Sequence, residues 1–223
     1  MTVFRCAAIL FDLDGVLVDS TRVVTEQYTR WALENGLDPE LILKAAHGVR
    51  TVEVIGRVAP HLDAAAETRK IEEREAAASE AMVMPGAIDL VNSIPGDRWC
   101  VVTSGTRLLA TGRMRGLGVP VPDILVTADD VKHGKPDPEP YRKGAELLRV
   151  DAAQCLAVED ALAGIRSAHA AGMRVVSLPT TYPVAELREA DVIVSGLPNI
   201  KVTADGAGRG SPLRVTLEAI AIP

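Results

Sequence analysis

The chain has 223 residues, of which 48% are hydrophobic, so it can bury a sizeable core and is not a disordered protein. Its 24 Lys and Arg residues against 30 Asp and Glu residues give a net charge of −6, which argues against a nucleic-acid-binding protein. Aromatic residues make up only 3%, which also excludes a broad base-stacking surface. An anionic small-molecule substrate is compatible with this charge, because a local site can oppose the global sign.

Three widely spaced cysteines, Cys6, Cys100 and Cys155, form no CxxC pair, so neither a disulfide framework nor a zinc site is expected. The longest uncharged apolar run near the N-terminus, Cys6–Phe11, is too short to span a bilayer, and no signal-peptide pattern accompanies it. We therefore expect a cytoplasmic protein in a reducing compartment, without a membrane partner.

Short apolar runs alternate with helical stretches along most of the chain. The first run, Ala7–Phe11, ends in an acidic turn that contains glycine, which is typical of a buried parallel strand. Similar runs follow at Trp99–Thr103, Ile124–Thr127, Cys155–Val158, Arg174–Leu178 and Val192–Val194. This alternation predicts an α/β fold with a Rossmann-like, mostly parallel sheet.

One stretch, from Ser20 to about Met84, contains no convincing strand and predicts four helices instead. The first helix ends at Gly36, and the second begins at residues 38–40 (DPE), where an N-cap precedes a proline and an acid. The third is expected over Thr51–Val58 and the fourth over Asp63–Glu80. We infer an all-helical cap inserted after the first strand.

The end of the chain predicts a β-hairpin. Leu213–Ala219 alternates apolar and polar residues with period two, Lys201–Ala204 is its expected partner, and a flexible connection contains Gly206, Gly208 and Gly210. The expected domains are therefore an α/β core, a helical cap and a terminal extension: residues 1–18 with 85–200, residues 19–84, and residues 201–223.

Acidic residues follow the first predicted strand. Asp12 and Asp14 are two residues apart, so their side chains point to the same side, and Gly15 follows them. Ligands of open α/β sheets bind at this end of the strands. The alternative is a solvated acidic loop in which Asp19 or Ser20 caps the next helix.

Three further polar clusters follow later predicted strands. Thr103 and Ser104 open a helix whose backbone N–H groups could bind an anion, although simple capping by Ser104 or Thr106 is the alternative. Lys135 stands between Gly and Pro, where it is either a fixed charge for a phosphate or an exposed loop lysine.

Two acids in a row, Glu159 and Asp160, follow another strand and could complete a hard-cation site with Asp12 and Asp14. In the alternative, Asp160 caps the helix that ends near Gly172. Each cluster alone is a modest signal, but all four occur in order at predicted strand ends.

Together these motifs resemble those of the haloacid dehalogenase-like hydrolases, over about residues 5–200. All four motifs of that superfamily match, and the helical insertion corresponds to its cap. Within the superfamily, HGVR (47–50), TSGTR (103–107), GKPDPEPY (134–141) and VEDALAG (158–164) are most similar to the sugar-phosphate phosphatases.

The resemblance implies a Mg²⁺-dependent phosphatase that acts on a small phosphorylated metabolite, above all a sugar phosphate. Asp12 would be the nucleophile that forms an aspartyl-phosphate, and Asp14 the general acid and base. Mg²⁺ would be held by the Asp12 carboxylate, the backbone carbonyl of Asp14 and the Asp160 carboxylate, with Glu159 as a weaker candidate.

The resemblance also implies contacts to the rest of the substrate. Arg50, with His47 nearby, lies where capped relatives place a substrate-recognition loop; otherwise it is a surface arginine that begins a helix. Arg107 either reaches the substrate or lies on the surface of its own helix. The phosphate would contact Lys135, the Thr103 hydroxyl, and backbone N–H groups near Gly15 and Ser104.

Two other functions remain open at this point. A β-phosphoglucomutase-like mutase shares the core and cap; Val16 favours it, whereas Val24 stands where those mutases carry a histidine. A non-catalytic metabolite-binding protein on the same fold is disfavoured, because the nucleophile, the acid, the lysine and the metal-binding acid are all present. Asp14 also argues against a dehalogenase, since that branch lacks the second acid of the first motif.

Overall fold

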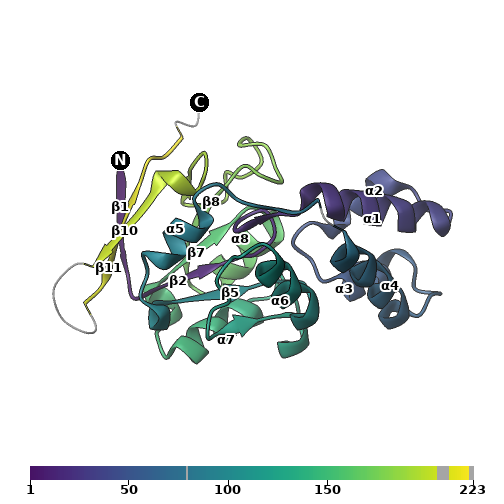
Figure 1. Cartoon of the computed structure of the whole chain (residues 1–223), viewed down its shortest axis with the longest axis horizontal. Helices are drawn as coiled ribbons and strands as arrows, with labels where there is room; N and C mark the ends of the chain where they lie inside the picture. Colours follow the sequence, from purple (N-terminus) through teal and green to yellow (C-terminus); the bar gives the residue numbers. More distant parts are fainter. Residues whose placement is uncertain (79, 205–210, 221–223) are drawn as a thin grey trace.

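The computed structural model describes residues 1–78, 80–204 and 211–220, and its centre is a six-stranded parallel sheet (Figure 1). The strand order is β6-β5-β2-β7-β8-β9, so the first strand of this sheet lies in its middle. Each predicted run overlaps one of these strands, although β7 extends one residue beyond its run, to Glu159, and this agreement confirms the Rossmann-like core. The strands are β2 (Ala8–Phe11), β5 (Trp99–Val102), β6 (Leu125–Val126), β7 (Cys155–Glu159), β8 (Arg174–Ser177) and β9 (Val192–Ile193).

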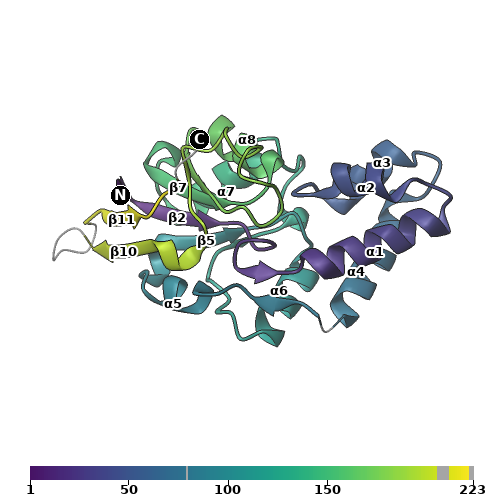
Figure 2. The ribbon, with the colours of Figure 1, turned by 90° about the horizontal axis from the view of Figure 1, so that it is seen from above.

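Helices cover both faces of the sheet (Figure 2). In β2, Ile9 and Phe11 belong to the apolar cluster that includes α5 and α6, whereas Ala8 and Leu10 belong to the cluster with α7 and α8. Because both faces are covered, β2 is a continuous apolar run rather than an alternating one. The helices are α5 (Ala87–Asn92), α6 (Arg107–Gly116), α7 (Glu139–Leu148) and α8 (Leu162–Ala170).

Four helices form the cap, a separate lobe at one end of the molecule with an apolar cluster of its own around Trp31 (Figures 1 and 2). They are α1 (Thr21–Glu34), α2 (Pro39–Ala46), α3 (Thr51–Val58) and α4 (Ala64–Ala77). The fourth helix is shorter than expected, with Asp63 as its N-cap. The expectation of no strand in this stretch is wrong, since β4 (Met82–Val83) pairs antiparallel with β3 (Val18–Asp19). A strand of two residues is too short to show a hydrophobic period in the sequence.

A three-stranded antiparallel sheet, β1-β11-β10, lies at the end of the molecule opposite the cap (Figures 1 and 2). β10 (Ile200–Ala204) and β11 (Leu213–Leu217) form the predicted hairpin, and its connecting glycines 206, 208 and 210 lie outside the described residues. β1 (Thr2–Cys6) adds a strand that the sequence reasoning missed, since its partner β11 is far away along the chain.

The three cysteines are free and buried. Burial raises the pKa of Cys6 to about 11 and that of Cys155 to about 12, so these thiols serve packing rather than reaction. Across the described parts of the chain, every helix is too short or too polar to cross a membrane.

Candidate active site

The predicted motifs meet at one edge of the central sheet. β2 lies between β5 and β7, so their carboxyl ends bring Asp12, Thr103 and Asp160 together. These three residues line a cavity of about 90 Å³ whose opposite wall consists of cap residues. The site therefore has a rigid wall from the core and a second wall from the cap.

Lys135 lies fully inside the protein, 1% exposed, and is held by three acceptors. Its Nζ donates to Asp12 Oδ1 (2.9 Å), the Val102 carbonyl (3.0 Å) and Glu159 Oε1 (2.7 Å). Such fixed charge-assisted bonds orient both carboxylates. The alternative of an exposed loop lysine is wrong, because β5 and β7 enclose the ammonium group.

Glu159 has hydrogen bonds on both carboxylate oxygens. Oε1 accepts from Lys135 and from the Tyr141 hydroxyl (2.7 Å), and Oε2 accepts from the backbone N–H groups of Asp160 (3.1 Å) and Ala161 (3.3 Å). These bonds occupy the lone pairs that a metal would need. Glu159 therefore orients Lys135. One of its carboxylate oxygens nevertheless lies within 4.8 Å of oxygens of Asp12 and Asp160.

Asp160 is almost fully buried and approaches the first loop closely. A Cβ at position 15 would collide with the Asp160 carboxylate, so this contact requires Gly15, whose φ is +80°. Thr181 donates its hydroxyl to Asp160 Oδ2. The capping alternative for Asp160 is wrong, because α8 has Ala161 as its N-cap and no side-chain cap.

The acids fit a hard divalent cation. Carboxylate oxygens of Asp12, Glu159 and Asp160 all lie within 4.8 Å of one another, and all three residues are buried. Burial and mutual repulsion raise the pKa of both Asp12 and Asp160, with Lys135 opposing the rise, so a cation would relieve the repulsion. Because Glu159 is already bonded, Asp12 and Asp160 are the side chains available to such a cation.

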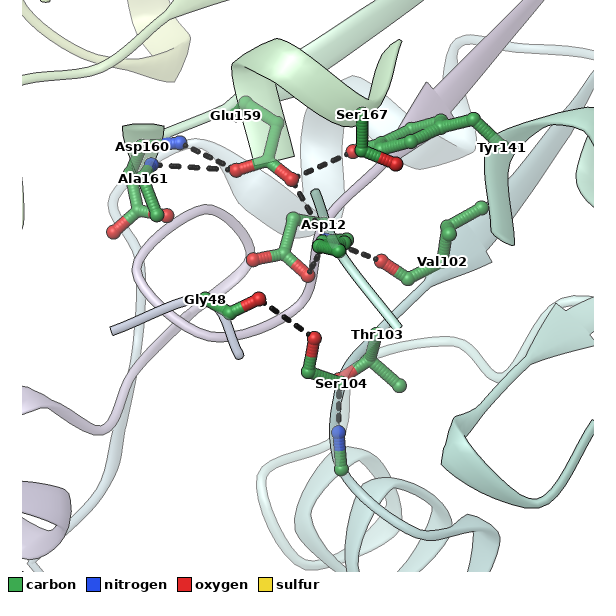
Figure 3. Close-up of polar contacts among 12 residues, drawn as sticks. Asp12, Gly48, Val102, Thr103, Ser104, Tyr141, Glu159, Asp160, Ala161 and Ser167 are labelled. Carbon is green, nitrogen blue, oxygen red and sulfur yellow. Dashed lines mark hydrogen bonds and ion pairs between the residues drawn. The ribbon is translucent and has the colours of Figure 1, made fainter. Parts of the chain in front are cut away.

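The second motif supplies hydroxyl groups with three different partners. Thr103 Oγ1 accepts from the Gly105 N–H (3.1 Å), whereas Ser104 Oγ donates to the Gly48 carbonyl of the cap (2.8 Å; Figure 3). Thr106 is the N-cap of α6 and also donates to Glu72 of the cap (2.6 Å). The capping alternative therefore holds for Thr106, while the Ser104 side chain ties the core to the cap.

Asp14 is held by two residues that sequence reasoning did not select as its partners. Ser20 Oγ donates to Asp14 Oδ1 (2.6 Å), and Arg113 of α6 forms an ion pair with the same oxygen. Arg113 also donates to Glu75 of the cap helix α4 (2.9 Å). Arg113 and Glu75 are both buried and both line the cavity. Only docking of the cap on the core brings them together, and no local pattern signals it.

Of the three expected substrate contacts, only His47 lines the cavity, where its ring packs edge-on against Tyr182 at 5.9 Å. Arg50 lies outside it: the guanidinium pairs with Glu53 and donates to carbonyls of the core loop. These carbonyls belong to Ala128 (3.3 Å), Val131 (2.9 Å) and Lys132 (2.6 Å). Arg50 thus fastens the cap to the core.

Arg107 also lies away from the cavity. Its guanidinium donates to the Leu125 carbonyl (2.9 Å) and to Asp130 (2.6 Å), and the side chain is 50% exposed. Of its two predicted alternatives, the structure places Arg107 on the surface of its helix.

This fold, with four motifs at the strand ends and a helical cap above them, matches a known family. A sequence profile of the haloacid dehalogenase-like hydrolases covers residues 6–172. The chain belongs to this family of hydrolases.

Individual relatives are similar over nearly the whole chain. Hexitol phosphatase A of Escherichia coli (strain K12) is 38% identical, over 92% of this chain and 97% of its own length. Glycerol-1-phosphate phosphohydrolase 2 of Saccharomyces cerevisiae is 32% identical, over 87% of this chain and 84% of its own length. The crystal structure of CbbY from Rhodobacter sphaeroides in complex with phosphate superposes with a TM-score of 0.75 at 25% identity, over 86% of this chain and 95% of that chain.

Proposed function

We propose that this protein is a Mg²⁺-dependent phosphatase that hydrolyses a small phosphorylated metabolite, a sugar or polyol phosphate, through an aspartyl-phosphate. The observation that carries the proposal is the buried pair of Asp12 and Lys135 beside Asp160, at the core wall of a cavity that the cap closes. The phosphatase names of the relatives support it. We also place the protein in the cytoplasm, in line with its unpaired cysteines.

In the first half of the reaction, a carboxylate oxygen of Asp12 attacks phosphorus. Lys135 donates to Oδ1 of Asp12, while Oδ2 has no hydrogen-bond partner among the described residues and is the proposed nucleophile. The bond from phosphorus to the ester oxygen breaks, and Asp14 gives its proton to the departing alkoxide. An aspartyl-phosphate and a free alcohol result.

In the second half, water attacks the phosphorus of the aspartyl-phosphate. Asp14, now a carboxylate, takes the proton of that water, and the bond between phosphorus and Asp12 breaks to release phosphate. Ser20 and Arg113 both hold Oδ1 of Asp14, so its orientation is fixed while Oδ2 exchanges the proton.

Two carboxylates and a phosphate monoester repel one another, so the site needs compensating positive charge. Asp12 and Asp160, with the backbone carbonyl of Asp14, would hold Mg²⁺, which when bound neutralises charge on the transferring oxygens. Lys135 compensates for the charges of Asp12 and Glu159, and the Thr103 hydroxyl with backbone N–H groups near Gly15 and Ser104 would bind the phosphate.

The test is Asp12→Asn, assayed for phosphate release from sugar phosphates with Mg²⁺. We expect turnover to fall by roughly four to six orders of magnitude, as for removal of other nucleophiles, while Mg²⁺-dependent binding of a phosphate analogue such as tungstate persists. Asp97→Asn, at an exposed position, is the matched control and should keep full activity. Normal turnover by Asp12→Asn would refute the assignment.

The two residues that bear on the mutase alternative lie in different parts of the folded protein. Val16, which favoured it in the sequence, is completely buried in the core and does not line the cavity, whereas Val24 does. Two assays separate these activities: one measures release of phosphate, and the other measures interconversion of glucose 1-phosphate and glucose 6-phosphate. We expect release of phosphate without interconversion.

A further inference from the structure

The cavity has two walls of different chemistry. When the phosphate of a substrate lies against Asp12, the remainder must extend toward the wall formed by the cap. The polar side chains of that wall come from α1, the turn between α2 and α3, the start of α3, and α4. They include Tyr28, His47, Thr51, Glu72 and Glu75.

The charged groups of the cap wall are acidic. Glu72 lines the cavity and accepts a hydrogen bond from the Thr106 hydroxyl through Oε2 (2.6 Å). Glu75 is 7% exposed and accepts from Arg113. Two carboxylates therefore lie where the leaving group must fit.

The cavity offers no cation to a second anionic group. Within the described residues, Arg113 is the only arginine or lysine that lines the cavity, and it already pairs with both Asp14 and Glu75. His47 does not compensate, because burial lowers its pKa and favours the neutral ring. A substrate with a second charge would meet like charges without a counterion.

We propose that the leaving group is a neutral polyhydroxyl compound, and that Glu72 and Glu75 exclude substrates with a second negative charge. Carboxylate oxygens accept hydrogen bonds from sugar or polyol hydroxyls, whereas a carboxylate or second phosphate would be repelled. The hydroxyls of Tyr28 and Thr51, bonded to each other at 2.9 Å, extend this polar wall. The inference rests on the proposed phosphatase function and specifies its substrate class.

The test compares sorbitol 6-phosphate with 6-phosphogluconate, which differ only in a hydroxymethyl group against a carboxylate at the far end. Burial raises the pKa of Glu75 to about 7, so the assays are run at pH 8, with saturating Mg²⁺, to keep the carboxyl groups of the cap wall ionised. We expect kcat/KM to favour sorbitol 6-phosphate by about 100-fold, the size of a repulsion between like charges in a partly buried site. Equal values, or a preference for 6-phosphogluconate, would overturn the inference.

Glu72→Gln removes one charge from the wall while keeping its shape. We expect the preference for sorbitol 6-phosphate to shrink about tenfold, mainly through better binding of 6-phosphogluconate. Glu73→Gln, at the next position of α4 but exposed, is the matched control and should leave the preference unchanged. An unchanged preference in Glu72→Gln would contradict the role given to Glu72.

Failure of the two proposals can be told apart. A wild-type protein that releases phosphate from none of the esters tested, p-nitrophenyl phosphate included, refutes the phosphatase function itself. One that hydrolyses both hexose derivatives equally is a phosphatase, but its cap wall does not select by charge.

Discussion

The two walls of the cavity are held in different ways. On the core wall, Lys135 and Glu159 are fully buried and share bonds with Asp12, Tyr141 and backbone groups, so each position is fixed several times over. On the cap wall, Glu72 is held by one core residue, Thr106, and Glu75 by one arginine, Arg113.

This difference separates chemistry from selection. Phosphoryl transfer needs donors and carboxylates that do not move, and the ends of a buried sheet provide them. The substrate must enter and leave, and the cap contacts the core through a limited set of side chains that can separate. Changes in the core wall should therefore abolish activity, whereas changes in the cap wall should alter which substrate is used.

After the loss of the nucleophile in Asp12→Asn, the next largest effect is expected at Asp160, the second side chain of the proposed metal site. Asp160→Asn removes one of two carboxylates available to Mg²⁺, so kcat/KM should fall by about 10³-fold, the loss of several kcal/mol of transition-state stabilisation. Kinetics as a function of Mg²⁺ concentration measures it, with Asp97→Asn as control. Full activity in Asp160→Asn at low Mg²⁺ would show that the metal lies elsewhere.

Lys135→Met tests the rigidity of the core wall. It leaves Asp12 and Glu159 buried without their cation, so metal-free protein should lose about 3–5 kcal/mol of unfolding free energy. Urea denaturation measures this loss. The double variant Lys135→Met/Glu159→Gln should regain part of the stability but none of the activity; recovery of activity would mean that Lys135 serves structure alone.

Arg50→Ala tests the attachment of the cap. Its guanidinium bonds to core carbonyls rather than the cavity, so kcat/KM should fall about tenfold for every substrate through poorer closure. The ranking of sugar phosphates should stay the same. A changed ranking would restore Arg50 as a residue that contacts the substrate.

Mg²⁺ should stabilise the protein, and more at high pH than at low pH. Burial raises the pKa of Asp12 to about 7, so at pH 5.5 protons occupy the carboxyl that Mg²⁺ needs, whereas at pH 7.5 they do not. Thermal unfolding with and without Mg²⁺ should show a gain in Tm that is a few degrees larger at pH 7.5. An equal gain at both values would argue against carboxylate ligation.

Most of the core wall could be predicted from the sequence because its main residues directly follow a buried strand or a glycine-containing turn. Asp12, Thr103 and Asp160 are local signals, and the parallel sheet brings their ends together. Tyr141 and Glu159 show where this reasoning stops, since their bond depends on how α7 packs against β7.

The cap wall could not be predicted in the same way. Glu72 and Glu75 belong to a helix rich in Ala, Glu and Arg that reads as solvent-exposed, and only the docked cap buries Glu75 against Arg113. Ile71 is buried and lies four residues before Glu75, so both are on the same face of α4. Ile71 is the one apolar residue whose position indicates that this face points inward. Likewise β1 was missed because its pairing with β11 joins the two ends of the chain.

The central claim is that the core wall carries covalent chemistry at Asp12. The most direct measurement is to mix the enzyme with Mg²⁺ and sorbitol 6-phosphate, quench with borohydride, and map the peptides by mass spectrometry. Borohydride reduces an acyl phosphate to an alcohol, so the account predicts homoserine at position 12 and nowhere else, and none in Asp12→Asn. Turnover without modification at position 12, or modification of another acid, would contradict it.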